Sequence, residues 1–348
     1  MMTRKIAFFD AKPYDIKSFT EMNKDFGFDI AYFETHLNAQ TASLSGDFDA
    51  ICAFVNDTID KAVIDEIIKH GVKLIALRCA GYNNVDFKAA YKKIHIARVP
   101  AYSPYAVAEH AAALMFSLNR KTHRAFFRTR DGNFSLNGLL GFDMHGKTAG
   151  VIGTGKIGKC LIAILKGVGM KLLAYDPFPD EAFAADAGVQ YVSLDEIYQQ
   201  ADIISLHCPL NKDTEYMINA QAISRMKNGV MIINTGRGKL IHTQALIDGL
   251  KSGKIGAAGL DVYEEESEYF FEDKSAQMIT DDILARLLMF PNVLVTSHQA
   301  FFTQEALRNI AQTTLQNCQD FFEHEKLVNE ICYKCGGPCT RKEKKLCF

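Results

Sequence analysis

The chain has 348 residues, 48% of them hydrophobic and 23% charged, which is the composition of a soluble globular protein of about two domains. This composition excludes a disordered chain, a collagen-like fibre and a disulfide-stabilised miniprotein. With 39 basic and 41 acidic residues, the net charge of −2 attracts neither nucleic acid nor an anionic membrane, and neither is predicted as a partner.

Strand-like and helix-like segments alternate over the first hundred residues. Strands are predicted at 5–9, 29–33, 50–54 and 74–78, with helices at 15–26 and 61–70. Strands separated by helices of ~10 residues indicate a parallel sheet with helices on its faces. A long, alanine-rich helix over 105–119 is predicted to join this domain to the next one.

A second α/β domain begins with an apolar strand at 148–152. A glycine-rich turn, a helix to about residue 168 and further apolar strands follow, the strands lying at 171–175, 203–207, 230–234, 257–261 and 293–297. Each of these strands is a continuous apolar run, as expected of strands buried on both faces. From 298 to about 323 the pattern is helical, and there the chain is expected to return to the first domain.

The predicted fold class is therefore α/β, with two Rossmann-like or flavodoxin-like domains, parallel sheets and an active-site cleft between them. No apolar run approaches the ~18–20 residues that a membrane span needs, and the N-terminal apolar run is too short for a signal peptide. An odd number of cysteines, nine, argues against a disulfide framework. A cytoplasmic enzyme is predicted.

A dinucleotide-binding turn is predicted between the strand at 148–152 and its helix. The run is Gly153-Thr154-Gly155-Lys156-Ile157-Gly158, and Asp176 ends the next strand, 18 residues after Gly158. Such glycines permit a tight turn, approach of the backbone to a pyrophosphate and close helix–strand packing. An acid at that position accepts ribose hydroxyls and repels a 2′-phosphate, so NAD is predicted rather than NADP. The alternative is a glycine-rich loop with Asp176 as a turn residue.

Six segments, taken together, resemble a known family in order and spacing. They are 78–86, 99–110, 153–158, 234–238, 259–266 and 296–301, the first reading Arg-Cys-Ala-Gly-Tyr-Asn-Asn-Val-Asp. The chain resembles the D-isomer-specific 2-hydroxyacid dehydrogenases over about residues 4–331, most closely the bacterial branch that reduces pyruvate to D-lactate in fermentation.

The resemblance implies an NAD-dependent oxidoreductase that interconverts pyruvate and D-lactate. Residues 1–101 and 298–331 would form a discontinuous substrate domain, 102–297 the NAD-binding domain, and 332–348 a cysteine-rich basic tail. Family members commonly pair through the cofactor domain, so a homodimer or homotetramer is implied.

Reduction of a 2-keto acid requires a cation for the carboxylate, a proton donor for the developing alkoxide and a source of hydride. The resemblance gives the first role to Arg237, whose planar guanidinium can bind the carboxylate and polarise the keto oxygen. It gives the second role to His298. It also implies that Glu266 accepts a hydrogen bond from the other ring nitrogen of His298, which favours the imidazolium.

Each of these three residues also has an ordinary structural interpretation. Arg237 alone could be a phosphate-loop or surface arginine, and His298 alone a core histidine. Glu266 belongs to the solvated acidic run 264–268. Its choice over the two acids before it depends on counting five residues from Asp261.

The same resemblance implies further contacts, each with ordinary packing as the alternative. Backbone N–H groups of the turn Arg78-Cys79-Ala80-Gly81 are expected to bind the substrate carboxylate as an anion nest. Tyr102 is expected to add a hydroxyl and Phe301 an apolar wall beside the substrate. Asp261 is expected to support Arg237 and the nicotinamide. The remaining implied cofactor contacts are Cys208, Pro209, Asn211, Thr235 and Gly236.

Two other functions remain open. The first keeps the chemistry and changes the substrate to a bulkier 2-keto acid, such as 2-ketoisocaproate or phenylpyruvate, because one methylene changes specificity by only ~1–3 kcal/mol. The second is an NADH-sensing binding protein, since transcriptional corepressors share this scaffold. The near-neutral charge and the lack of a basic DNA-binding segment before the tail count against it.

The tail carries a possible metal-binding motif and has no counterpart in the family pattern. Its cysteines have the spacing C-x2-C-x3-C-x7-C, at Cys332, Cys335, Cys339 and Cys347. Four thiolates favour zinc, with an iron–sulfur cluster as a second option. The tail is also basic, with a net +4 from Lys334, Arg341, Lys342, Lys344 and Lys345 against Glu343. The alternatives are a flexible extension without a site and redox or disulfide chemistry. No other metal site is predicted.

Overall fold

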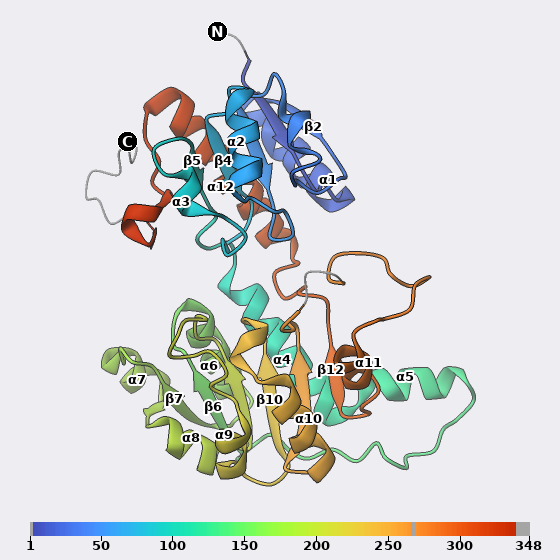
Figure 1. Cartoon of the computed structure of the whole chain (residues 1–348). Helices are drawn as coiled ribbons and strands as arrows, with labels where there is room; N and C mark the ends of the chain where they lie inside the picture. The colour runs from blue at the N-terminus through green and yellow to red at the C-terminus, as the bar shows by residue number, and fades with distance from the viewer. Residues whose placement is uncertain (1–2, 266–268, 339–348) are drawn as a thin grey trace. The chain divides into compact units, whose positions relative to one another are not determined.

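The chain folds into two compact α/β units. A computed structural model describes residues 3–265 and 269–338. The terminal unit combines Met1–Ser103 with Phe302–Phe348, and the central unit is Pro104–Phe301. Each is built on a parallel sheet (Figure 1), so the predicted two-domain α/β fold class is confirmed. Among the described residues, no helix combines the length and apolar character that a membrane crossing requires.

The terminal unit contains a five-stranded sheet in the order β2-β1-β3-β4-β5. Its strands are β1 Lys5–Phe8, β2 Asp29–Tyr32, β3 Ala50–Ala53, β4 Leu74–Leu77 and β5 His95–Ala97. Its helices are α1 Pro13–Met22, η1 Asn23–Asp25, η2 Ala42–Ser45, α2 Lys61–Lys69, α3 Phe87–Ala90 and α12 Gln304–His324. A C-terminal hairpin adds β13 Ile331–Cys332, η5 Tyr333–Cys335 and β14 Gly337–Pro338. Every residue of the central strands β3 and β4 is buried.

The central unit contains a seven-stranded sheet in the order β12-β11-β10-β9-β6-β7-β8. Its strands are β6 Thr148–Ile152, β7 Lys171–Tyr175, β8 Gln190–Tyr191, β9 Ile203–Leu206, β10 Val230–Asn234, β11 Ile255–Leu260 and β12 Val293–Val295. Its helices are α4 Pro104–Arg120, α5 Thr122–Arg130, α6 Lys156–Gly167, α7 Glu181–Ala187, α8 Leu194–Gln200, α9 Ala220–Arg225, η3 Gly238–Leu240, α10 Thr243–Ser252 and α11 Asp282–Leu288. The order reverses at β6, and ligands of open parallel sheets collect at the carboxyl ends of the strands beside such a reversal.

Two apolar clusters hold the central sheet between helices. One cluster includes Ile197 of α8, Ile223 of α9 and Leu246 of α10. The other includes Met115 of α4 and Leu161 of α6. Burial on both faces explains why the strands read as continuous apolar runs.

Helix α12 begins at Gln304, six residues later than the apolar pattern predicts. Thr303 caps it, since its side chain accepts a hydrogen bond from a first-turn N–H. The preceding segment is a loop, because His298 has φ 52° and the next two N–H groups donate to the Asp261 carboxylate. Hydrogen bonds from this loop to Asp261, which is far away in the sequence, therefore override the local helical pattern.

Arg78 is a buried cation at the end of β4, with 2% of its surface exposed. Its guanidinium donates to the main-chain oxygen of Asp10 at 2.6 Å and to the Asp15 carboxylate at 3.4 Å. It also lies over the rings of Phe8 and Phe54, at 4.5 and 4.6 Å. These contacts tie the ends of β1 and β4 to helix α1.

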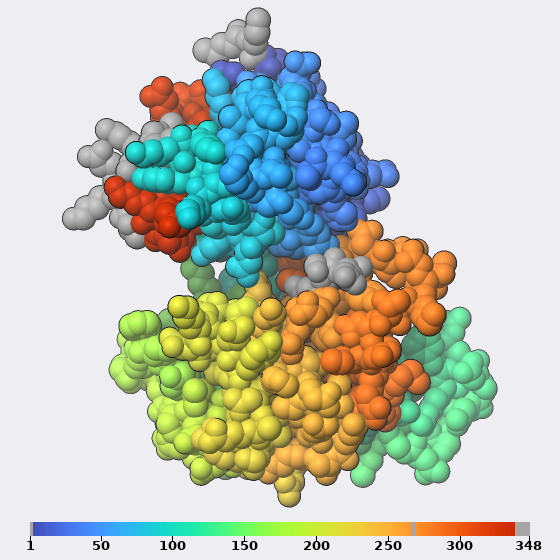
Figure 2. All heavy atoms as spheres, viewed as in Figure 1, coloured from blue at the N-terminus to red at the C-terminus, as the bar shows by residue number. Residues whose placement is uncertain are grey.

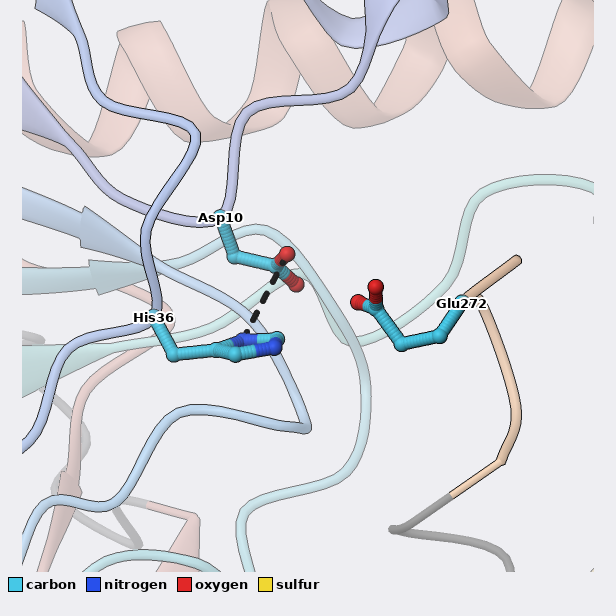
Figure 3. Close-up of side chains that lie close together, drawn as sticks. All are labelled: Asp10, His36 and Glu272. Atoms are coloured by element: carbon cyan, nitrogen blue, oxygen red, sulfur yellow. Dashed lines mark ion pairs between the residues drawn. The ribbon is translucent and has the colours of Figure 1, made fainter. Parts of the chain in front are cut away.

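Asp10 is the buried acid next to this guanidinium. It follows β1 with φ 51°, and its carboxylate lies 2.9 Å from Lys12 Nζ and 3.5 Å from His36 Nδ1 (Figure 3). Arg78 approaches the same carboxylate at 3.9 Å. A buried carboxylate is costly unless it is paired, and here two permanent cations compensate it.

We expect Arg78→Met to lower the free energy of unfolding by about 3–5 kcal/mol, because the buried carboxylates of Asp10 and Asp15 would lose their shared guanidinium. Urea unfolding followed by circular dichroism measures this. The matched control is Arg308→Met on the exposed side of α12, which should change stability by less than about 0.5 kcal/mol. Equal unfolding midpoints for the two variants would contradict this structural role.

Candidate active site

The predicted residues of the central unit line one edge of its sheet. The glycine turn 153–158 follows β6, Cys208 comes after β9, Arg237 after β10, Asp261 after β11 and His298 after β12. These five strands are consecutive in the sheet order. Because parallel strands end at the same edge, the fold brings together groups that are up to 145 residues apart.

The glycine turn has the shape that a dinucleotide needs. Gly153 has φ 95°, and a Cβ there would lie 2.6 Å from the backbone nitrogen of Cys208. A Cβ at Gly158 would lie 2.0 Å from the carbonyl oxygen of Gly153, so helix α6 packs closely on the turn. At Gly155 a Cβ would meet no described atom within 4 Å. The backbone there is open to a pyrophosphate, and the first-turn N–H groups of α6 favour an anion.

Asp176 is fixed beside this turn. Its Oδ2 accepts hydrogen bonds from the N–H and Oγ1 of Thr154, at 2.8 and 3.2 Å. Its Oδ1 accepts from the N–H of Phe178 at 2.9 Å. A carboxylate offers about four acceptor positions, so Asp176 both orders the turn and keeps acceptor capacity for ribose hydroxyls. The predicted cofactor residues around Gly153–Gly158 therefore fit NAD.

The loop after β9 is shaped mainly by its own side chains. Asn211 Oδ1 accepts a hydrogen bond from the N–H of Thr214 at 3.1 Å, and Pro209 O accepts from Thr214 Oγ1 at 2.6 Å. The backbone nitrogen of Cys208 lies against Gly153, which puts this loop beside the glycine turn. The cofactor contacts predicted for these three residues stay predictions.

His207 is a titratable group of this loop that the sequence analysis left out. Its Nε2 lies 2.8 Å from Ser205 Oγ, and burial lowers the pKa of the imidazole to about 4. His207 is therefore neutral near pH 7, which excludes it as the source of an imidazolium proton.

The turn after β10 presents Arg237. Its geometry is fixed by Asn234, whose side chain accepts from the N–H of Gly236 at 3.0 Å and donates to the carbonyl oxygen of Arg237 at 2.9 Å. Half-buried Arg237 donates one hydrogen bond to Gly236 O at 2.8 Å, and among the described residues it forms no ion pair with a carboxylate. Its remaining donors suit a planar anion. Thr235 Oγ1 is buried, and no described residue hydrogen-bonds it, which suits the predicted ligand contact.

Asp261 holds the loop that carries His298. Its carboxylate accepts hydrogen bonds from Thr296 Oγ1 at 2.5 Å, from the N–H of Gln299 at 2.9 Å and from the N–H of Ala300 at 2.8 Å. Its carbonyl oxygen accepts from the N–H of His298 at 2.8 Å. A left-handed backbone costs a non-glycine residue roughly 1–2 kcal/mol, and this network offsets that cost at His298. The predicted support of Arg237 by Asp261 stays a prediction.

His110 of helix α4 supports this network and was missed by the sequence analysis, since a histidine on an alanine-rich helix carries no catalytic pattern. Its Nε2 lies 3.3 Å from Asp261 Oδ1 and 3.1 Å from Thr296 Oγ1. Burial alone would raise the pKa of the Asp261 carboxyl. Hydrogen bonds from His110, Thr296 and the N–H of Ala300 outweigh burial and hold that pKa below its ordinary value, so Asp261 stays ionised.

One apolar ring lies beside the imidazole of His298, and a second lies beside the first. The ring of Phe271 is 5.8 Å from the ring of His298 and 6.4 Å from that of Phe301. Phe301 is buried. The family resemblance predicts Phe301 as an apolar wall. Phe271 stands in the loop between β11 and α11, and no motif in the sequence marks it.

Glu266 lies outside the described residues, so its pairing with His298 stays a prediction. The structure does narrow the alternatives in the acidic run. Glu264 Oε1 accepts hydrogen bonds from the N–H and Oγ1 of Thr243, at 2.7 and 2.6 Å, and its Oε2 accepts from Tyr216 Oη at 3.1 Å. The carboxylate of Glu264 is thus engaged by Thr243, at the start of α10, and by Tyr216. Glu265, in contrast, is exposed.

In the terminal unit, the prediction for Arg78 needs correction. Its backbone N–H donates to the carbonyl oxygen of Ala53 at 3.0 Å, which extends the β3–β4 ladder, and its guanidinium is buried against Asp10 and Asp15. Arg78 is therefore a structural residue, and its N–H is unavailable to a substrate carboxylate.

The carbonyl groups of the three residues after Arg78 are all hydrogen-bonded, and the predicted binding of a substrate carboxylate by this turn stays a prediction. The carbonyl oxygen of Cys79 accepts from the N–H of Val99 at 3.1 Å, and that of Ala80 accepts from Arg98 at 2.7 Å. The Cys79 thiol donates to Gly81 O at 3.3 Å. Because the carbonyl groups are engaged, the turn is held in one conformation. Among the described residues, none accepts a hydrogen bond from the N–H of Ala80 or Gly81.

Tyr102 stands at the end of the first segment of this unit. Its carbonyl oxygen accepts a hydrogen bond from Asn309 Nδ2 of helix α12 at 2.6 Å, which fixes its backbone. Its ring is half-buried. A contact of its hydroxyl with substrate stays a prediction.

Asp176→Ala should weaken NAD binding and narrow the preference for NAD over NADP, since it removes both a ribose acceptor and the charge that repels a 2′-phosphate. We expect the ratio of kcat/KM for the two cofactors to fall by about tenfold or more, equivalent to ~1.4 kcal/mol. The chain has no tryptophan, so binding is followed by NADH fluorescence. Exposed Asp213→Ala makes the same charge change and should leave the ratio unaltered. If both variants gave the same ratio of kcat/KM for NAD and NADP, Asp176 would be only a turn residue.

Comparisons with known proteins identify the family of the chain. Residues 112–300 match the model of the "D-isomer specific 2-hydroxyacid dehydrogenase, NAD binding domain" family. The chain is 53% identical over 328 residues to D-lactate dehydrogenase of Escherichia coli K12, covering 94% of this chain and 99% of the relative. The apo structure of D-lactate dehydrogenase from Escherichia coli superposes with a TM-score of 0.87 at 51% identity, over 94% of this chain and 99% of that one.

Two further solved structures resemble this chain at lower sequence identity. The pyruvate reductase of Chlamydomonas reinhardtii has a TM-score of 0.88 at 46% identity, covering 92% of this chain and 96% of that one. A D-2-hydroxyisocaproate dehydrogenase has a TM-score of 0.84 at 33% identity, over 94% of this chain and 99% of that one. This chain therefore belongs to the D-isomer-specific 2-hydroxyacid dehydrogenase family and is an NAD-dependent oxidoreductase.

Proposed function

We propose that this enzyme interconverts pyruvate and D-lactate, with NADH and NAD as the redox partners. The observation that carries the proposal is the carboxyl edge of the central sheet. There Arg237 and His298 follow strands β10 and β12, on either side of the Asp261 strand and in the same unit as the glycine turn. The 53% identity to a protein named D-lactate dehydrogenase supports pyruvate as the keto acid.

The proposed reaction needs three actions on the substrate. Arg237 binds the carboxylate and polarises the keto oxygen with the planar donors of its guanidinium. His298, as the imidazolium, gives its proton to the oxygen that becomes the hydroxyl. When bound, NADH supplies the hydride for the carbonyl carbon. The reaction consumes one keto acid, one NADH and one proton and yields one hydroxy acid and one NAD.

Two further roles belong to this proposal. The N–H groups of Ala80 and Gly81 bind a carboxylate oxygen, which fits a turn whose carbonyl groups are already engaged. Glu266 accepts a hydrogen bond from His298 and stabilises its protonated form. The occupation of Glu264 by Thr243 and Tyr216 supports the register that selects Glu266.

A bulkier 2-keto acid is the second candidate substrate. The fold match to a D-2-hydroxyisocaproate dehydrogenase, at 33% identity, shows that the family scaffold accommodates such enzymes. The ring of Phe271 occupies space close to His298, and the ring of Phe301 lies beside Phe271. Large rings there favour a small substrate side chain. Pyruvate is therefore the preferred assignment.

A homodimer or homotetramer in the cytoplasm completes the proposal. Large apolar side chains are exposed on α5 and on the segment that follows it, at Phe126, Phe127, Phe134, Leu136 and Leu140. Exposed apolar groups that cluster along one segment mark a protein–protein contact. A second copy of this chain suits them, since the family implies pairing through the cofactor domain.

A panel of 2-keto acids assayed with NADH and NADPH, with chiral analysis of the product, tests the function. We expect D-lactate from pyruvate, and kcat/KM values for 2-ketoisocaproate and phenylpyruvate lower by about tenfold or more. Higher kcat/KM for a bulkier acid would favour the second candidate. NADH binding without turnover of any keto acid would contradict the enzymatic proposal and favour a sensing role.

Glu266→Gln should move the pH optimum of pyruvate reduction downward by about one unit, because His298 loses the carboxylate that stabilises its protonated form. Initial rates across pH, at saturating NADH, measure the shift. Glu264→Gln is the matched comparison and should leave the optimum in place, since Glu264 holds Thr243 and Tyr216. A shift in the Glu264 variant alone would show that the register of the catalytic acid is wrong.

A further inference from the structure

The cysteines of the C-terminal tail carry no inference, since Cys339 and Cys347 lie outside the described residues. The zinc site predicted there stays a prediction.

The loop between β11 and α11 places an aromatic ring beside His298. The structure describes residues 263–265 and 269–281 of this loop. The ring of Phe271 lies 5.8 Å from the imidazole of His298, and the two ring planes meet at 33°. The buried ring of Phe301 lies 6.4 Å from that of Phe271. Phe271 therefore has two ring neighbours, and one of them is the proposed proton donor.

The backbone of Phe271 has a conformation that side chains rarely adopt. Its φ is 71°, in the left-handed region, where a bulky residue is an outlier. His298 has φ 52°, so both members of this ring pair have a left-handed backbone. Such residues persist only where surrounding contacts hold them, and they gather at active sites and ligand-binding sites. The position of the Phe271 ring therefore depends on contacts of the loop around it.

Tyr269 supplies hydrogen bonds that hold this part of the loop. Its Oη accepts from the N–H of Asp281 at 3.0 Å and from the N–H of Thr280 at 3.2 Å, and it lies 2.9 Å from Thr280 Oγ1. One phenol oxygen thus joins two stretches of the loop that are eleven residues apart. Tyr269 precedes Phe271 by two residues, so these hydrogen bonds restrain the backbone next to the Phe271 ring.

Asp281 ties the two ends of the same loop together. Its Oδ2 accepts a hydrogen bond from Tyr263 Oη at 2.7 Å, and its Oδ1 accepts from the N–H groups of Ile283 and Leu284 and so caps helix α11. Burial and the acceptor Asp281 raise the pKa of the Tyr263 phenol, so Tyr263 stays a donor near neutral pH. The loop is therefore fixed at its start, next to β11, and at its end, next to α11.

A small apolar cluster supports the aromatic part of the loop. Its buried residues are Tyr263, Phe270 and Leu284, and Phe271 is among the half-buried side chains that pack against it. These three residues lie outside the two larger clusters that hold the central sheet. In contrast, residues 275–278 are exposed, and Figure 2 shows orange atoms of this part of the chain on the surface of the central unit. The Phe271 ring is thus held by the packed part of an otherwise exposed loop.

We propose that Phe271 sets the size of the substrate side chain and that Tyr269 is the positioning residue that holds it, an inference that rests on the proposed reduction of a 2-keto acid. His298 must come within about 3 Å of the keto oxygen to give its proton. The keto carbon is ~1.2 Å beyond that oxygen, and the substrate side chain begins at the next bond. Its atoms therefore occupy space next to the imidazole, where the Phe271 ring limits the room to a methyl group.

Phe271→Ala tests this role, with kcat/KM measured for pyruvate, 2-ketobutyrate and 2-ketovalerate on the full chain with NADH. We expect the ratio of kcat/KM for 2-ketovalerate to that for pyruvate to rise by about tenfold or more, since one methylene in an apolar pocket changes specificity by about 10- to 200-fold. Phe271→Leu keeps an apolar side chain in the cluster and should raise the ratio less. It also answers the question if the alanine variant does not fold.

Tyr269→Phe tests the positioning role separately, because it keeps the ring and removes the oxygen that accepts from Thr280 and Asp281. We expect the same ratio to rise by about threefold. In the Phe271→Ala background the change should not alter the ratio further, since no ring remains to be positioned. A merely structural loss would lower kcat/KM for all the keto acids alike. Tyr32→Phe is the matched control, because its hydroxyl also contacts a threonine, Thr20 of the terminal unit, and the ratio should stay unaltered.

The outcomes separate this inference from the proposed function. Native turnover of pyruvate with unchanged ratios in both Phe271 variants would overturn the inference and leave the proposed function standing. A native protein that binds NADH and reduces no keto acid would overturn both. Independent, additive effects of Tyr269→Phe and Phe271→Ala on the ratio would overturn the positioning role of Tyr269.

Discussion

The active-site edge of the central unit depends on one buried carboxylate. Asp261 directly follows β11, and its carboxylate oxygens accept hydrogen bonds from two backbone N–H groups and one hydroxyl of the segment that follows β12. That loop carries His298. Without a buried acceptor at this point, the loop would expose its amides and the helical pattern that precedes α12 could continue. The position of the imidazole is therefore set by an acid on the neighbouring strand and by His110 behind it.

Carboxylates of other acids serve as backbone anchors elsewhere in the molecule too. Asp176 receives the N–H of Thr154 and so orders the glycine turn. Asp57, at the end of β3, receives the N–H groups of Leu37 and Phe54 at 2.6 Å each. In parallel sheets the loops at the carboxyl edge have few partners in the ladder, so a carboxylate that accepts several N–H bonds gives them a fixed shape. Asp261, Asp176 and Asp57 each hold such a loop through backbone hydrogen bonds.

Sequence reasoning predicts most of this architecture because the signals are local. The bounds of β6, β7 and β10 follow directly from apolar runs that end at polar or glycine residues. The glycine turn is equally readable, since Gly153 and Gly158 permit contacts that no side chain allows.

The predictions that fail, and the residues that were missed, depend on contacts between parts of the chain that are far apart in the sequence. Nothing near Arg78 in the sequence shows that Ala53, 25 residues earlier, takes its N–H. The start of α12 depends in the same way on Asp261, which precedes it by 43 residues. His110 and Phe271 matter through partners far away in the chain. Strand β5, only three residues long, is too short for its pattern to stand out. When the role of a residue depends on partners far away in the chain, that role can be recognised only once the fold is known.

The pKa of the Asp261 carboxyl is lowered in the folded protein, and this direction explains why such an anchor suits a proton-transfer site. An acid whose pKa is lower in the folded state contributes stability at any pH above its ordinary value, and that contribution disappears as the pH falls through the lowered folded value. For Asp261 the lowering reflects hydrogen bonds that outweigh burial. The loop anchor therefore stays charged throughout the range in which an imidazole gains and loses its proton. In the proposed reaction, His298 gives its proton to the substrate while the Asp261 carboxylate that positions its loop remains ionised.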